Sequence, residues 1–250
     1  CADLLILLIG TAISANLDLS GAFWQKMETI KQRPSHDRWS NPRFGFWELM
    51  TVSLVILDRD GVINHDSDDY IKSPDEWQPL PGSLEAIARL CRADYTVVVA
   101  TNQAGVGRGL FSQEMLIRIH RKMASSIRDK GGRLDSVFFC PHSPADQCGC
   151  RKPKPGMLLE ISDRLGIGLS SVPVVGDSLR DLEAAEAAGA IPVLVKTGRG
   201  RLTQEKLSKG ELSHTLGQTP VYADLAAFTD AVLDGRLESV ARHTDQGTHH

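Results

Sequence analysis

The chain has few cysteines, and most of them lie close together. Five cysteines occur in 250 residues, and Cys140, Cys148 and Cys150 fall within one short segment that also contains a histidine. A fold held together by disulfides has its cysteines spread along the chain as a framework. The clustering therefore favours metal binding, with a Cys148–Cys150 or Cys140–Cys148 disulfide in a secreted protein as the alternative.

The sequence also has no dense run of basic residues and no long apolar run. The formal net charge is −3, which argues against nucleic acid or an anionic membrane surface as the main partner. The apolar stretch ADLLILLIGTAI near the start is shorter than the roughly 20 residues that a membrane helix needs. It also has no basic flank of the kind that precedes a signal peptide. We therefore expect a cytoplasmic protein, with no nucleic-acid or membrane partner.

Repeats, low-complexity tracts and long linkers are absent from residues 51–199, so we interpret this span as one domain. The first convincing strand begins just after Met50, and the sequence starts without Met. We expect residues 1–49 to be an extension of unknown role, translated from before a natural start at Met50. Residues 200–250 are polar and weakly periodic, and we expect a partly helical extension with a helix near residues 225–237.

Short apolar runs alternate with amphipathic stretches through the predicted domain. This order favours a doubly wound, Rossmann-like parallel α/β sheet. Ser112 and Ser178 are predicted helix N-caps, and Asp181 has the spacing of a capping box with Ser178. The predicted strands are 54–57, 95–101, 134–139, 172–177 and 191–196, and the predicted helices are 83–90, 112–130, 156–165 and 178–190.

Polar groups follow four of these predicted strands. Asp58 and Asp60 end the first, Thr101 ends the second, a cysteine–histidine loop follows the third, and Asp177 ends the fourth. Ligands of open α/β sheets bind outside the carboxyl ends of the strands. A lone D-x-D-G is as easily a turn with solvated acids, but four polar strand ends at one edge predict a site.

The acids at this edge are suited to a hard cation. Residues i and i+2 of a strand point to the same side, so Asp58 and Asp60 should emerge together and Arg59 should point away. Two close carboxylates repel each other unless a cation lies between them. With Asp177 arriving from the fourth strand, the oxygen ligands are of the kind that Mg²⁺ prefers.

The cysteine segment has the pattern C-x-H-x5-C-x-C, formed by Cys140, His142, Cys148 and Cys150. Three thiolates and one imidazole complete a tetrahedral Zn²⁺ shell and leave no open position for water. We therefore expect a structural zinc rather than a catalytic one. The alternative is a plain loop that contains thiols.

These residues together resemble the motifs of the haloacid-dehalogenase-like (HAD-like) phosphatases over roughly residues 53–199. The resemblance implies that Asp58 is a nucleophile that forms an aspartyl-phosphate, and that Asp60 is the general acid and base. It further implies that Thr101 and Lys152 hold the transferring phosphoryl oxygens. Mg²⁺ would be held by Asp58, the backbone carbonyl of Asp60, and Asp177. The matching residues are Asp58, Asp60, Thr101, Lys152, Asp177 and Asp181.

Within that superfamily, DRDGVIN, TNQAGVGRG, CRKPKPGM, VGDSLRDLEAAEAAG and VLVKTGRG are similar to the D,D-heptose 1,7-bisphosphate phosphatase group. This similarity implies an essentially capless enzyme that removes the 7-phosphate of D-glycero-D-manno-heptose 1,7-bisphosphate, a step toward the ADP-heptose of lipopolysaccharide cores. We expect a monomer that acts on a small phosphorylated sugar. The implied substrate contacts are Asp66, Tyr70, Asn102, Gln103 and Arg151.

The sequence departs from this group at two positions, and three rival interpretations remain. Some members have Ser where Ala104 stands and Lys where Ser178 stands. Histidinol-phosphate phosphatases share the acids and a zinc loop of similar spacing. A polynucleotide 3′-phosphatase is disfavoured because the chain has no basic groove and no Walker-type loop. A non-catalytic, zinc-stabilised binding module is the third rival.

Overall fold

The computed structural model describes residues 53–209 and 214–237, so the expected extension at residues 1–49 lies outside the described residues. Six parallel strands form one sheet in the order β3-β2-β1-β4-β5-β6. The predicted doubly wound α/β sheet is therefore confirmed. The strands are β1 (Leu54–Leu57), β2 (Thr96–Asn102), β3 (Ser136–Cys140), β4 (Pro173–Gly176), β5 (Ile191–Val195) and β6 (Val221–Tyr222).

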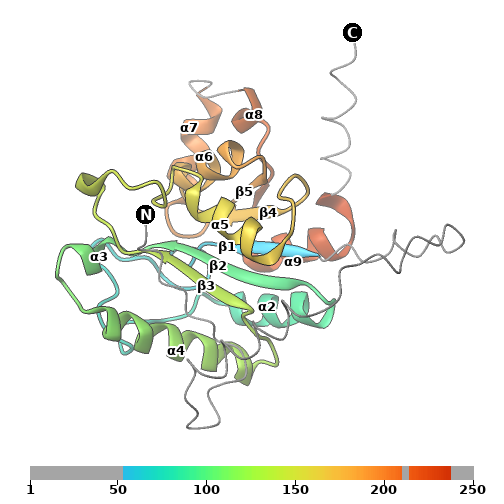
Figure 1. Cartoon of the computed structure of the whole chain (residues 1–250). Helices are drawn as coiled ribbons and strands as arrows, with labels where there is room; N and C mark the ends of the chain where they lie inside the picture. Colours follow the sequence, from blue (N-terminus) through green and yellow to red (C-terminus); the bar gives the residue numbers. More distant parts are fainter. Residues whose placement is uncertain (1–52, 210–213, 238–250) are drawn as a thin grey trace, which may run out of the picture.

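Helices cover both faces of the sheet (Figure 1). Because side chains alternate along a strand, Val55 and Leu57 of β1 face one core, and Leu54 and Ile56 face the other. The first core is closed by α2 (Ser83–Arg92), α4 (Gln113–Asp129) and α9 (Leu225–Leu233). The second is closed by α5 (Gly156–Leu165) and α6 (Leu179–Ala187).

The helix starts follow the expected capping chemistry. The Ser112 side chain accepts a hydrogen bond from the Met115 backbone N–H at the start of α4. Ser178 and Asp181 form the predicted capping box at the start of α6. That box has a second role, because Asp181 is also one of the acids at the carboxyl edge of the sheet.

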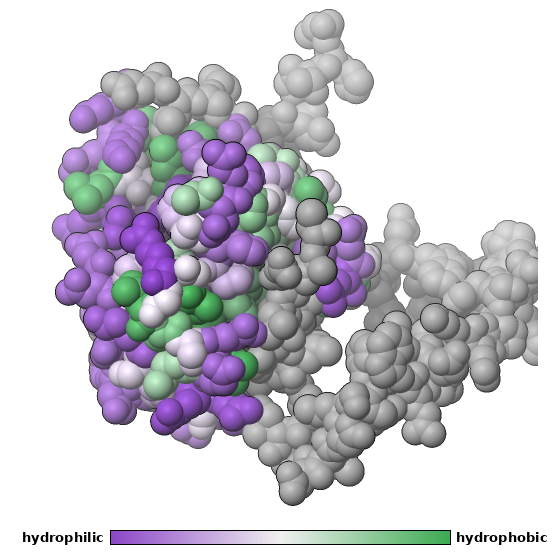
Figure 2. Space-filling view, turned by 60° about the vertical axis from the view of Figure 1, so that its left-hand side comes forward, coloured by the Kyte–Doolittle hydropathy of each residue, from purple (hydrophilic) through white to green (hydrophobic). Residues whose placement is uncertain are grey.

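Short elements complete the fold. These are α3 (Ala104–Gly107), the 3₁₀ turn η2 (Pro144–Asp146), α7 (Gly200–Ser208) and α8 (His214–Gly217). None of the helices in the two described spans is both long and apolar enough to cross a membrane. On the face seen in Figure 2, hydrophilic residues cover most of the coloured surface, and hydrophobic residues form small separate areas.

The chain after residue 199, predicted as an extension, adds to the same sheet and core. β6 pairs with β5 through Leu194–Val221 and Val195–Tyr222. The side chain of Phe228 on α9 is fully buried in the core that α2 and α4 also line. Residues 200–209 and 214–237 therefore contribute to the folded unit that carries the strand ends.

Replacing Phe228 with alanine should lower the free energy of unfolding by about 3–5 kcal/mol, because a buried aromatic is removed and a cavity is left. Leu202 on α7 is 62% exposed, so Leu202→Ala should change the free energy by less than about 0.5 kcal/mol. Urea unfolding of both variants measures the difference. Equal, small effects would show that α9 contributes little to the core.

Candidate active site

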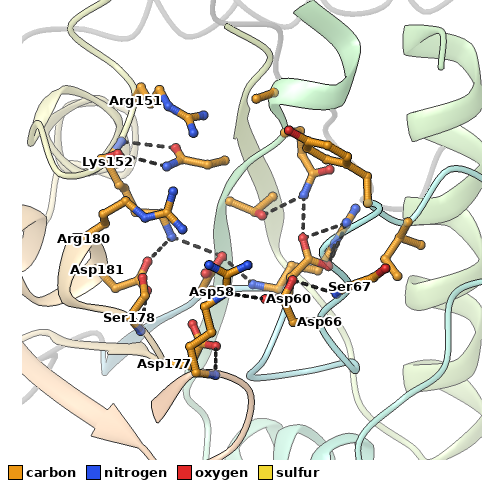
Figure 3. Close-up of a pocket in the computed structure, with 18 of the residues that line it drawn as sticks. Asp58, Asp60, Asp66, Ser67, Arg151, Lys152, Asp177, Ser178, Arg180 and Asp181 are labelled. Atoms are coloured by element: carbon orange, nitrogen blue, oxygen red, sulfur yellow. Dashed lines mark hydrogen bonds and ion pairs between the residues drawn. The ribbon is translucent and has the colours of Figure 1, made fainter. Parts of the chain in front are cut away.

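A polar pocket lies at the carboxyl edge of the sheet, where β1, β2 and β4 end (Figure 3). Every acid and every substrate-contacting residue expected from the sequence lines it. Their convergence from distant parts of the chain follows from the parallel sheet, which brings the strand ends together. The predicted residues that line the pocket are Asp58, Asp60, Asp66, Tyr70, Thr101, Asn102, Gln103, Arg151, Lys152 and Asp177.

Asp58 follows β1 directly and points into this pocket. Its Oδ1 accepts a hydrogen bond from the Arg59 backbone N–H at 2.7 Å and lies 3.1 Å from the Lys152 Nζ. Burial raises the pKa of Asp58 to about 7, against the opposing effect of the Lys152 charge. Asp58 is thus a nearly buried carboxylate that requires positive charge beside it.

Lys152 supplies part of that charge. Its side chain is 3% exposed, and its Nζ lies 3.1 Å from Asp58 Oδ1 and 2.5 Å from Asp181 Oδ1. The Nζ also donates a hydrogen bond to the Ala100 carbonyl at 2.8 Å. Although burial alone would lower the pKa of Lys152, the Asp181 and Asp58 carboxylates raise it. The lysine is therefore held charged between two acids.

Asp177 follows β4 and is packed against glycine backbone. Its Oδ2 accepts a hydrogen bond from the Arg199 backbone N–H at 2.8 Å. A Cβ on Gly61 would lie 2.0 Å from this oxygen, and one on Gly198 would lie 2.1 Å from it. Burial raises the pKa of Asp177 to about 8, and the nearby Asp181 and Asp58 charges add to the rise. Only glycine fits at both contact points.

One carboxylate oxygen each from Asp58, Asp177 and Asp181 lies within 4.8 Å of the others. Three acids and one lysine leave an excess of negative charge, and hard oxygen donors at this spacing fit a divalent cation such as Mg²⁺. The sequence prediction named Asp60 as the remaining ligand through its backbone carbonyl, and this stays a prediction. The Asp181 carboxylate belongs to the group, although no metal contact was assigned to it from the sequence.

The side chain of Arg59 was expected to point away from the acids, and this expectation was wrong. It is 1% exposed, and its Nη2 donates to both oxygens of Asp60 at 2.8 Å. Its Nη1 lies 3.3 Å from Nε2 of the buried His120. The chain bends at Arg59 after β1 ends at Leu57, so the alternation of a strand no longer fixes the direction of the side chain.

The side chains of Asn102, the last residue of β2, and of Gln103, the next residue, are hydrogen-bonded to other parts of the protein. Asn102 bonds to the backbone of Lys152. The Gln103 Nε2 donates to Asp60 Oδ2 at 2.9 Å and to Thr101 Oγ1 at 3.0 Å. The predicted substrate contacts of Asn102 and Gln103 therefore stay predictions, since both line the pocket while bonding to its walls.

Charged side chains in and near the pocket contact neighbouring groups of the protein. Arg199 Nε lies 3.0 Å from Asp66 Oδ2, and Arg199 Nη2 lies 2.7 Å from Asp68 Oδ1. The Arg108 guanidinium carbon lies 5.8 Å from the centre of the Tyr70 ring. Arg151 Nη1 donates to the His142 carbonyl at 3.2 Å.

Sequence reasoning assigned no role to Arg180 and Arg199, which also line the pocket. Arg199 lies in the VKTGRG segment that follows β5, and its position after a strand was the available signal. Arg180 is on the first turn of α6, beside the acids.

The second cluster contains the four predicted zinc ligands. The Cys150 Sγ lies 3.4 Å from each of the Cys140 Sγ, the Cys148 Sγ and the His142 Nδ1, and the Cys140 Sγ lies 3.6 Å from the latter two atoms. Ligand atoms around a tetrahedral zinc are roughly 3.5–3.8 Å apart. The four cysteines of the described residues are free thiols, and the spacing fits a metal ion.

Family models match most of this folded region. A model described as polynucleotide kinase 3 phosphatase matches residues 53–179. A HAD-hydrolase-like model matches residues 149–226. The two matches together span the sheet and its carboxyl edge.

Curated relatives and solved structures match at high identity. The D-glycero-β-D-manno-heptose-1,7-bisphosphate 7-phosphatase of Bordetella bronchiseptica is 54% identical over 73% of this chain and 98% of that protein. The protein of the same name from Pseudomonas aeruginosa is 51% identical over 74% of this chain and 99% of that protein. The crystal structure of D,D-heptose 1,7-bisphosphate phosphatase from B. bronchiseptica, complexed with magnesium and phosphate, superimposes with a TM-score of 0.69 at 54% identity. It covers 73% of this chain and 99% of that chain.

A divalent cation should bind the three acids more tightly as pH rises. Below the raised pKa values of about 7 for Asp58 and about 8 for Asp177, the cation must displace protons. Its apparent affinity should therefore fall about tenfold per pH unit for each such carboxyl. Calorimetric titration of MgCl₂ at pH 6.0 and 8.5 measures the change.

The thermal unfolding temperature gives a second measurement. Since both pKa values are raised in the folded state, the metal-free protein should lose stability as pH rises from about 4 to about 8. Added MgCl₂ should raise the unfolding temperature more at pH 8.5 than at pH 6.0. The Asp177→Asn substitution should reduce this difference between the two pH values. The same Mg²⁺ effect at both pH values would contradict the three-acid site.

Proposed function

The chain belongs to the family of the D-glycero-β-D-manno-heptose-1,7-bisphosphate 7-phosphatases within the HAD-like hydrolases, and from this we propose that it removes the 7-phosphate of D-glycero-D-manno-heptose 1,7-bisphosphate. This reaction is a step toward the ADP-heptose of lipopolysaccharide cores. The observation that carries the proposal is the pocket that joins Asp58, Asp177, Asp181 and Lys152 in a chain that spans nearly the full length of these relatives.

Asp58 is the nucleophile in this proposal. A carboxylate oxygen attacks phosphorus in line, the P–O bond to the sugar C7 oxygen breaks, and an aspartyl-phosphate forms. Water then attacks that phosphorus and returns Asp58 to a carboxylate. The backbone N–H of Arg59 and the Lys152 Nζ engage Oδ1, which fixes the orientation of the carboxylate.

Asp60 is the general acid and base. It gives a proton to the departing C7 oxygen and takes one from the attacking water. Its carboxylate is oriented by hydrogen bonds that the side chains of Arg59 and Gln103 donate to it.

Asp58, Asp177 and Asp181, with the Asp60 carbonyl, would hold Mg²⁺. When bound, this ion supplies positive charge that offsets the repulsion between carboxylate and phosphate. Thr101 and Lys152 lie beside Asp58 and can donate hydrogen bonds to the transferring phosphoryl oxygens. The presence of magnesium and phosphate in the structure of the B. bronchiseptica relative supports this assignment.

The pocket mouth carries the groups that would bind the rest of the substrate. Arg151 follows the last cysteine of the metal cluster, and its guanidinium can bind a second phosphate in bidentate fashion. Asp66 and Tyr70 also line the pocket and can contact sugar hydroxyls. We further infer that the protein acts as a monomer in the cytoplasm without a nucleic-acid partner.

The sulfur and nitrogen ligands of Cys140, His142, Cys148 and Cys150 would hold a structural Zn²⁺. Burial raises the pKa of the Cys140 thiol, so a cation is needed to keep this thiolate charged. The segment from Pro141 to Pro155 has only a short 3₁₀ turn, and a metal would define its path. Arg151 and Lys152 follow the cluster directly, so the zinc would also fix their approach to the pocket.

A polynucleotide 3′-phosphatase is the second candidate, because a model of that family matches residues 53–179. The matched span contains Asp58, Asp60, Thr101, Lys152 and Asp177, which any phosphatase of this fold would use. The formal net charge of −3 offers little attraction for a nucleic acid. Among small substrates, histidinol phosphate is the alternative to heptose bisphosphate, since histidinol-phosphate phosphatases share the acids and a zinc loop of similar spacing.

Phosphate release with Mg²⁺ present should be fastest with heptose 1,7-bisphosphate, slower with histidinol phosphate, and slowest with a 3′-phosphorylated oligonucleotide. Asp58→Asn should reduce the rate at least about a hundredfold, because the nucleophile is lost. Faster release from histidinol phosphate or from the oligonucleotide would show that heptose bisphosphate is not the preferred substrate. Equal rates in the wild type and Asp58→Asn would favour a non-catalytic binding module.

The purified protein should contain one zinc per chain by elemental analysis. Cys148→Ser should lose the metal and lower the unfolding temperature, since three ligands no longer close the tetrahedral shell. Cys91→Ser is the matched control, because Cys91 is bonded to the Arg133 backbone, away from the cluster. Full zinc content in Cys148→Ser would contradict the assigned ligand set.

A further inference from the structure

Asn102, the last residue of β2, bonds to both backbone groups of Lys152. The Asn102 Nδ2 donates to the Lys152 carbonyl at 3.0 Å, and the Lys152 backbone N–H donates to Asn102 Oδ1 at 3.1 Å. Figure 3 shows both bonds as dashed lines at Lys152. A side-chain amide thus pairs with one residue's main chain as a neighbouring strand would.

The backbone of Lys152 has no regular structure of its own. Residues 147–155 lie outside helices and strands, between η2 and α5. Hydrogen bonds within this segment, from Lys154 N–H to the Arg151 carbonyl and from Gly156 N–H to the Gly149 carbonyl, flank Lys152 without involving it. The Asn102 amide therefore holds the one residue of the segment whose side chain reaches Asp58.

The backbone of Lys152 has to be placed accurately because its side chain makes several contacts at once. The side chain is 3% exposed, and its Nζ contacts Asp58, Asp181 and the Ala100 carbonyl. A displacement of its backbone by about 1 Å would change all three contacts, and misplacement of this size can cost about a hundredfold in rate.

We infer that Asn102 is a positioning residue, which aligns Lys152 with Asp58, and that its amide serves Lys152 rather than the substrate. The inference rests on the proposed function, in which Lys152 binds the phosphoryl oxygens. It deepens that function by giving the metal-binding loop two anchors. The cysteine cluster fixes where the loop leaves β3, and Asn102 fixes where it reaches the site.

A double-mutant cycle with orthovanadate and Mg²⁺ as the probe tests this. Vanadate resembles the transferring phosphoryl group, so its binding does not depend on which phosphate ester is the substrate. In the full chain, Asn102→Ala should weaken vanadate binding about tenfold, as measured by calorimetry. With Lys152→Ala already present, the same substitution should have less than about a twofold effect, because Asn102 acts through Lys152.

Lys154→Ala is the matched control. The Lys154 Nζ donates to the Gln147 carbonyl at 2.7 Å, so this variant removes a hydrogen bond from the same segment without touching Lys152. It should bind vanadate as the wild type does. Zinc content and amide hydrogen exchange are measured alongside, and Asn102→Ala should keep its zinc while exchange at the Lys152 amide becomes faster.

Three results would overturn the inference. They are an equal loss of vanadate binding from Asn102→Ala with and without Lys152, unchanged exchange at the Lys152 amide, and loss of zinc from Asn102→Ala. Tight vanadate binding by a wild type that fails to hydrolyse heptose bisphosphate would end the substrate proposal alone and leave the role of Asn102 standing.

Discussion

The placement of Lys152 between Asp58 and Asp181 is the interaction on which the site depends. Three acids at one sheet edge would repel each other, and burial raises the pKa values of Asp58 and Asp177. The lysine offsets part of this charge but not all of it. The remaining negative charge favours a divalent cation, which would in turn offset the charge of a phosphate ester bound beside it.

The elements that form the fold could largely be predicted from the sequence, because apolar runs such as Leu54–Leu57 identify buried strands without tertiary information. The strand β6 could not, since its two residues Val221–Tyr222 are too few to show a pattern. Its place in the sheet comes from pairing with β5 and from the packing of Phe228. Both are tertiary effects.

The residues at the site could be located from the sequence more easily than the directions of their side chains. Strand ends predict which residues gather, because a parallel sheet fixes that edge. The direction of Arg59 could not be predicted, since the chain bends where the strand stops. The Asn102–Lys152 pairing was equally hidden, because it joins residues 50 positions apart through one side-chain amide. The metal roles and substrate contacts assigned from the motifs stay predictions.

The main chain and the side chain of Arg199 contact different acids. The backbone N–H holds the carboxylate of Asp177, and any residue other than proline provides that group. The guanidinium instead forms ion pairs with Asp66 and Asp68. A substitution at this position can therefore change the ion pairs beside the pocket while the hydrogen bond to Asp177 is kept. Changes in substrate preference could arise here without loss of the catalytic residues.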